Sequence, residues 1–130
     1  MRIKAICTYP DGPTLNGNIY SPQVLADAFN EPVFQEMNSM CAIPVKDSVV
    51  EGRVIGFACA TLDGKRIEID ANIIDKVYEE LLQDIYDTAG ISLAGMCEKE
   101  PSGTLTAIKY REALLTSYSA VSCSMEIIKE

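Results

Sequence analysis

The side chains of this sequence that could do chemistry are serine and cysteine nucleophiles, clustered carboxylates, and lysines that would have to act as bases. None of the 130 residues is histidine, which is the usual general base near neutral pH and the commonest metal ligand. The chain therefore cannot assemble a Ser-His or Cys-His catalytic pair, and it cannot build a histidine-based zinc site. Any nucleophile needs a different proton acceptor.

The cysteines are odd in number and widely spaced, and no two of them form a CxxC pair. They are Cys7, Cys41, Cys59, Cys97 and Cys123. This spacing predicts neither a zinc site nor a disulfide framework. The apolar residues around them predict buried, reduced thiols, which are typical of a reducing compartment. A single nucleophilic cysteine is the alternative, and it would lack a base to activate it.

The carboxylates form no arrangement that predicts acid–base catalysis or metal binding. Glu79 and Glu80 are adjacent on an expected helix, so they diverge and predict a solvated face. Glu98 and Glu100 flank Lys99, which would also be typical of a solvated segment. The aspartates at 11, 47 and 70 lack calcium-loop spacing, and Asp63 favours a turn. We therefore expect no metal and no cofactor.

Size and charge limit the possible partners. The chain has a mass of 14.2 kDa and a net charge of −8, with 11 basic and 19 acidic residues. Such an acidic chain is poorly suited to binding a phosphate backbone, so we expect no nucleic acid partner. No apolar run approaches the roughly 20 residues of a membrane span, and the first residues fit a strand better than a signal peptide. We expect one domain, residues 1–130, made in the cytosol and not in a membrane.

Alternation of apolar and polar residues, together with the turn signals, predicts an α+β fold. Ile3, Ala5 and Cys7 alternate with polar residues, and Asp63-Gly64 is a tight hairpin signal. Residues 111–116 fit no single element. We expect strands at 2–7, 53–62, 65–70, 91–97, 104–110 and 121–127, and residues 41–45 form a short apolar run that ends in a polar loop at 46–48. Six or seven strands ordered as hairpins predict a small, mostly antiparallel sheet or barrel.

Two or three helices are expected beside this sheet. Ser21 is a helix N-cap with Pro22 in the first turn, and the helix is interrupted and restarted near Pro32 to end at about residue 40. Asn72 is expected to cap a third helix. The apolar stripe of that helix comprises Ile73, Ile74, Val77, Tyr78, Leu81 and Ile85.

Four segments, in this order, resemble parts of the prohead proteases of tailed phages. Residues 16–25, N-G-N-I-Y-S-P-Q-V-L, are similar to the N-G-R-x-Y-P-x-x-V-L segment near the start of those proteases. Residues 53–69 resemble the hairpin after the catalytic histidine, and 73–86 resemble the helix before the nucleophile strand. Residues 90–95, G-I-S-L-A-G, are similar to the G-[VI]-S-x-x-[GA] strand that carries the nucleophilic serine. Residues 107–121 lie where the family has its next strand, so the resemblance spans most of the chain.

The resemblance implies the fold of phage prohead and herpesvirus maturation proteases, a small β-barrel flanked by helices. In that family a histidine, often before a proline, lies between the first helix and the hairpin. The corresponding residues 41–46 read C-A-I-P-V-K, so the proline is present and the histidine is missing. Ser92 keeps the place of the nucleophile but has no base, and a serine hydroxyl is a weak nucleophile without one. We therefore expect no catalytic residues and regard Ser92 as a relict.

These features favour a non-enzymatic structural or assembly protein of a phage, which binds capsid or other virion proteins through its protease-like surface. We expect it in the virion, and in the host cytoplasm during assembly. Strands near both chain ends are expected at sheet edges, which favours a homo-oligomer.

Two alternatives stay open. The first is an active maturation protease with a Ser92–Lys46 dyad, which would require a desolvated Lys46 with a strongly lowered pKa. Lys46 lies beside Asp47 in what the sequence predicts to be a polar loop, which counts against this alternative. The second is a host-directed regulatory phage protein that reuses the fold.

Overall fold

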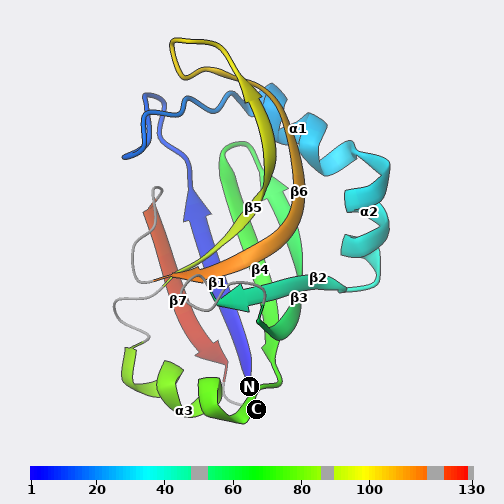
Figure 1. Cartoon of the computed structure of the whole chain (residues 1–130), viewed down its shortest axis with the longest axis vertical. Coiled ribbons are helices and arrows are strands. Elements are labelled where there is room, and N and C mark those ends of the chain that lie inside the picture. The colour runs from blue at the N-terminus through cyan, green and yellow to red at the C-terminus, as the bar shows by residue number, and fades with distance from the viewer. Residues whose placement is uncertain (48–52, 86–89, 117–121, 129–130) are drawn as a thin grey trace.

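The computed structural model is a sheet curled into a half-barrel, with two helices along one side and a third across its lower end (Figure 1). It describes residues 1–47, 53–85, 90–116 and 122–128. The strands are β1 (Arg2–Thr8), β2 (Ile43–Asp47), β3 (Val54–Asp63), β4 (Arg66–Ile73), β5 (Gly90–Lys99), β6 (Leu105–Thr116) and β7 (Ser122–Ile128). The helices are α1 (Pro22–Asn30), α2 (Pro32–Ser39) and α3 (Lys76–Ile85).

The seven strands form one sheet in the order β5-β6-β2-β3-β4-β1-β7. Neighbouring strands are antiparallel, except that β2 and β6 run parallel. The predicted α+β class, with a mostly antiparallel sheet and helices beside it, is confirmed. Residues 111–116, which the sequence left unassigned, continue β6 without a break.

The core lies inside the curl, where alternate residues of each strand point. On β1 the inward residues are Ile3, Ala5 and Cys7, as the alternation predicts. Ile67 and Ile69 continue the same layer on β4, and all five side chains are at most 1% exposed. Burying an isoleucine contributes roughly 1.5–3 kcal/mol, so this layer is a main source of stability.

Helices α1 and α2 begin at residues that cap them with their side chains. Ser21 Oγ accepts a hydrogen bond of 3.1 Å from the backbone N–H of Val24, which confirms the predicted start of α1. Glu31 caps α2, since its carboxylate accepts a 2.8 Å bond from the N–H of Phe34. Arg111 on β6 binds the same carboxylate, with Nη1 3.0 Å from Oε2. This ion pair fixes the start of α2 against the sheet.

The predicted start of the third helix is wrong. Asn72 and Ile73 belong to β4, where Ile73 pairs with Gly56, so Asn72 caps nothing. Helix α3 begins at Lys76, and the side chain of Asp75 accepts a 3.0 Å bond from the N–H of Val77. Strand β4 extends into the segment whose spacing predicted a helix, because its backbone pairing with β3 continues through Ile73.

The predicted apolar stripe of this helix is only partly right. Tyr78 and Leu82 are buried, at 7% and 0% exposure. Ile74, Val77 and Leu81 are exposed by 56%, 65% and 43%. The face of α3 that meets the core therefore carries Tyr78 and Leu82, four residues apart, while the side chain of Ile85 lies outside the described part of the structure.

Two further predictions are corrected by the sheet. Strand β1 is not an edge, because it pairs with both β4 and β7, and the edges are β5 and β7. Lys46 and Asp47 do not lie in a polar loop, because β2 extends through both of them. The expected start of the last strand at Val121 lies outside the described residues.

Candidate functional site

Ser92 and Lys46 lie in one row across three neighbouring strands. Ser92 on β5 pairs in register with Leu114 on β6, and Leu114 pairs with Lys46 on β2. The three side chains are half-buried, while Ile91 and Leu93 on either side of Ser92 point into the core. The row therefore faces outward from the curled sheet. Two strand spacings separate the backbones of Ser92 and Lys46 by roughly 10 Å.

Lys46 is held by a carboxylate and not by Ser92. Its Nζ lies 2.8 Å from Oε2 of Glu112 on β6, and the Lys46 side chain is 31% exposed. A lysine becomes a base when its ammonium is desolvated. Lys46 instead keeps both a counter-ion and access to water. Within the described part of the chain, no hydrogen bond or ion pair joins Ser92 to Lys46.

A buried polar cluster that was not predicted from the sequence lies on the opposite face of β2. Asp47 is 9% exposed, and its Oδ2 accepts a hydrogen bond from the hydroxyl of Tyr78 on α3. The guanidinium of Arg53 lies 5.2 Å from the centre of the Tyr78 ring, and its Nη2 is 2.7 Å from Oδ2 of Asp75. The bond to Asp47, followed by burial, raises the pKa of Tyr78. A polar residue at the end of an apolar strand is the only signal that could have indicated this cluster.

The cluster holds α3 against the lower end of the half-barrel. It brings residues from β2, the start of β3 and α3 to one point. Its acid and its phenol are both enclosed, so neither group is positioned to act on a molecule at the surface. The cluster is therefore a structural one.

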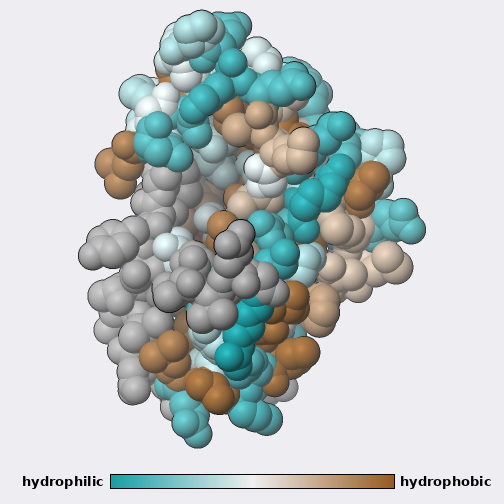
Figure 2. All heavy atoms as spheres, in the orientation of Figure 1, coloured by the Kyte–Doolittle hydropathy of each residue, from teal (hydrophilic) through white to brown (hydrophobic). Residues whose placement is uncertain are grey.

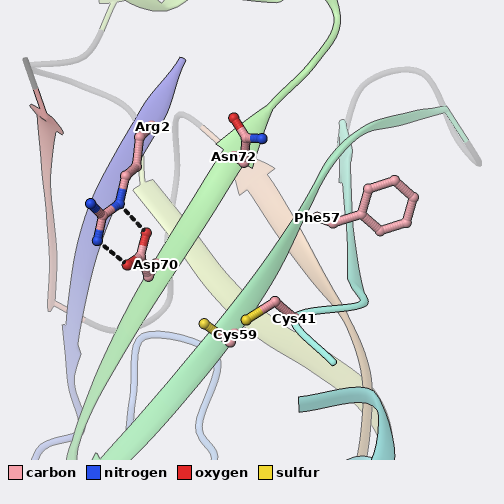
Figure 3. A pocket seen from close by; sticks show the side chains of 6 residues that line it. All are labelled: Arg2, Cys41, Phe57, Cys59, Asp70 and Asn72. Atoms are coloured by element: carbon pink, nitrogen blue, oxygen red, sulfur yellow. Dashed lines mark hydrogen bonds and ion pairs between the residues drawn. The ribbon is translucent and has the colours of Figure 1, made fainter. Parts of the chain in front are cut away.

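A groove of about 480 Å³ lies on the outer face of β3, β4 and β1 (Figure 3). Arg2 crosses it and binds Asp70, with Nε–Oδ1 at 2.9 Å. This bond lowers the pKa of the Asp70 carboxyl. Phe57 and Asn72 line the groove beside them, and Phe57 is 43% exposed. The groove therefore presents an ion pair and an aromatic ring at the surface.

The thiols differ from the prediction that all are buried. Cys7 is buried, Cys59 and Cys123 are half-buried, and Cys41 and Cys97 are exposed. Cys41 follows α2 with φ of 50°, a left-handed backbone that favours glycine. Figure 3 shows its sulfur beside that of Cys59 in the groove. Burial, and then the neighbouring Cys41 thiol, raise the pKa of Cys59 to about 11.

The prediction that Glu79 lies on a solvated face is wrong. Its Oε1 binds the N-terminal ammonium at 2.8 Å, and its side chain is only 20% exposed. This bond lowers the pKa of Glu79. Glu80, Glu98 and Glu100 are exposed, as a solvated surface requires.

Neither a metal-binding group of side chains nor a membrane-spanning helix is found among the described residues. No group of three or more histidine, cysteine, aspartate or glutamate side chains among them is arranged to hold a metal ion. Across the same residues, no helix has the length and apolar character needed to cross a membrane.

Comparisons with known proteins place the chain in no family. No protein-family model matches the sequence. No curated protein and no solved structure matches it either. A function must therefore be argued from the residues and their geometry.

Proposed function

We propose that this chain is a non-enzymatic structural or assembly protein of a phage, and that it binds capsid or other virion proteins through a protease-like scaffold. The observation that carries the proposal is the environment of Ser92. Its hydroxyl lies on an outward row whose lysine is bound to Glu112 at 2.8 Å. A serine nucleophile needs a proton acceptor, and this row supplies a paired cation.

The order of the elements supports the protease-like part of the proposal. Helices α1 and α2, the β3–β4 hairpin, α3 and the strand with Ser92 follow one another as the four resembling segments require. A half-barrel flanked by helices is compatible with a small maturation-protease barrel. The scaffold would then persist in a chain that has lost its histidine.

An exposed apolar surface supports the binding part of the proposal. Figure 2 shows apolar side chains at the lower end of the molecule, over α3 and the start of β3. The exposed residues of this region are Val54, Ile74, Val77 and Leu81, each at least 41% exposed. Exposed apolar patches commonly mark protein interfaces. Strands β5 and β7 are the edges of the described sheet, and edge strands can pair with a second copy.

A serine-reactive fluorophosphonate probe separates this proposal from the dyad alternative. We expect no labelling of the wild-type chain above that of Ser92→Ala. A second variant, Glu112→Gln, releases Lys46 from its ion pair and leaves it in the same row as Ser92. Ser92-dependent labelling of the wild-type chain would overturn the non-enzymatic proposal, and a further rise in Glu112→Gln would identify Lys46 as the base.

Two measurements test the structural role. Light scattering coupled to gel filtration should show self-association that depends on concentration. Mass spectrometry of purified particles should find the chain in many copies. A monomer at high concentration that is missing from particles would refute this role, and would favour a host-directed regulatory protein.

A further inference from the structure

Cys7 and Cys123 face each other across the β1–β7 pair at the edge of the sheet. They are direct partners in the antiparallel register, although 116 positions separate them in the sequence. Their sulfur atoms lie 2.7 Å apart. A disulfide needs about 2.05 Å between the sulfurs, so only a small side-chain rotation separates this pair from bonding distance.

The pair also lies at the seam where the half-barrel comes nearest to closing. The Cys7 thiol donates a 3.0 Å hydrogen bond to the carbonyl oxygen of Ile91 on β5. In the sheet order, β5 and β7 are the two edges, and β7 hydrogen-bonds to the sheet through β1. A link between these two cysteines would therefore hold the last strand of the described sheet in place.

The two thiols differ in their access to reagents. Cys7 is buried, whereas Cys123 is half-buried. The hydrogen bond with Cys123, followed by burial, raises the pKa of Cys7. Thiol–disulfide exchange proceeds through a thiolate, so a small reagent should react first at Cys123.

We propose that Cys7 and Cys123 form an intramolecular disulfide when the chain meets an oxidising small-molecule disulfide such as oxidised glutathione. The Cys123 thiolate attacks one glutathione sulfur, forming a mixed disulfide and releasing one glutathione thiolate. Cys7 then loses its proton to water, and its sulfur attacks that of Cys123, releasing the second glutathione. Two protein thiols give up two electrons and two protons, and the glutathione disulfide takes them up as two thiols.

Under oxidising conditions the disulfide would link β7 covalently to β1. Forming it removes the Cys7 proton, so the hydrogen bond to Ile91 is replaced by a covalent link to Cys123. Cross-linking residues so far apart in sequence strongly restricts the unfolded chain, which in the entropic account stabilises the folded state. The pair would behave in this way whatever partner the chain binds.

The test uses the full chain with the other three cysteines replaced, as Cys41→Ser/Cys59→Ser/Cys97→Ser. Only Cys7 and Cys123 then remain, and trypsin separates them into peptides 5–46 and 112–129. The chain is equilibrated with reduced or oxidised glutathione, alkylated with iodoacetamide and digested. The matched control adds Cys123→Ser, which alters the half-buried member and leaves the buried Cys7 in place.

We expect peptide 5–46 linked to 112–129 only after oxidation, and a thermal midpoint raised by roughly 5–15 °C. The control should show neither change. Both cysteines remaining open to alkylation, or Cys123 carrying glutathione with no link to Cys7, would overturn the proposal. A linked product whose thermal unfolding midpoint is not raised would overturn the stabilising role of the disulfide.

Discussion

The hydroxyl of Tyr78 provides the clearest test of how α3 is held to the half-barrel. It donates a hydrogen bond to the carboxylate of Asp47, and both residues are less than 10% exposed. Replacing Tyr78 with Phe removes the hydroxyl and keeps the ring. The Arg53 guanidinium, 5.2 Å from the ring centre, keeps its contact with that ring. The change therefore isolates one hydrogen bond to a buried acid.

We expect Tyr78→Phe to lower the free energy of unfolding by about 1.5–3 kcal/mol, the range for a hydrogen bond to a charged group. Urea unfolding at pH 7, followed by circular dichroism, measures this loss. A double-mutant cycle with Asp47→Asn assigns it to the pair, because the Tyr78 loss should shrink when Asp47 is already neutral. Additive losses within about 0.5 kcal/mol would refute the assignment.

The pH dependence supplies a second, independent check. The folded chain raises the pKa of Tyr78, chiefly because its hydroxyl donates to Asp47. The stabilisation is therefore complete below the pKa of unfolded tyrosine, about 10, and is lost as the pH rises through the folded value. The difference in the free energy of unfolding between wild type and Tyr78→Phe should be constant from about pH 7 to 9 and should become smaller above about pH 10. A difference that becomes larger there would contradict this account.

Two further substitutions test the sheet and the start of α2. Gly56→Ala should destabilise the chain by about 1–3 kcal/mol, because the new Cβ would lie 2.2 Å from the carbonyl oxygen of Asn72; Gly12→Ala, with no atom within 4 Å, is the neutral control in urea unfolding. Glu31→Gln should cost about 1 kcal/mol at pH 7, because it weakens both the helix cap and the Arg111 pair. Arg111 lowers the pKa of Glu31, so the difference in the free energy of unfolding between wild type and Glu31→Gln should become smaller as the pH falls below about 4. A difference that stays unchanged down to pH 2 would contradict this role of Glu31.

Local patterns predicted the elements of the fold well where the chain itself supplied the signal. Alternation identified β1, and Ser21 with Pro22 identified the start of α1. The predicted hairpin joins β3 and β4, although its two turn residues are Gly64 and Lys65, one position later than the Asp63-Gly64 signal suggested, with Gly64 at φ of 61°. The assignment of Ile73 to a helix was wrong because this residue fits both the alternation of a strand and the spacing of a helix. Its spacing fits the helical stripe, but backbone pairing with Gly56 keeps it in the strand.

The candidate site depended on long-range pairing that no local pattern contains. Ser92 and Lys46 share a row only because β2 and β6 run parallel, which brings both into register with Leu114. The partner of Lys46 is Glu112, 66 positions further along the sequence, and nothing near Lys46 indicates it. The approach of Cys7 to Cys123 was missed for the same reason, since spacing alone does not show which strands are neighbours.

The register of β2 decides which of two neighbouring charged residues shares a face of the sheet with Ser92. Lys46 and Asp47 are adjacent, so they point to opposite faces of the sheet, the lysine outward and the aspartate into the core. The buried acid is thus on the face away from the serine. A slip of β2 by one residue would exchange the two, burying the ammonium and moving Asp47 out of reach of Tyr78. The bond between Tyr78 and Asp47 therefore helps to keep β2 in the register that places Lys46 on the outer face.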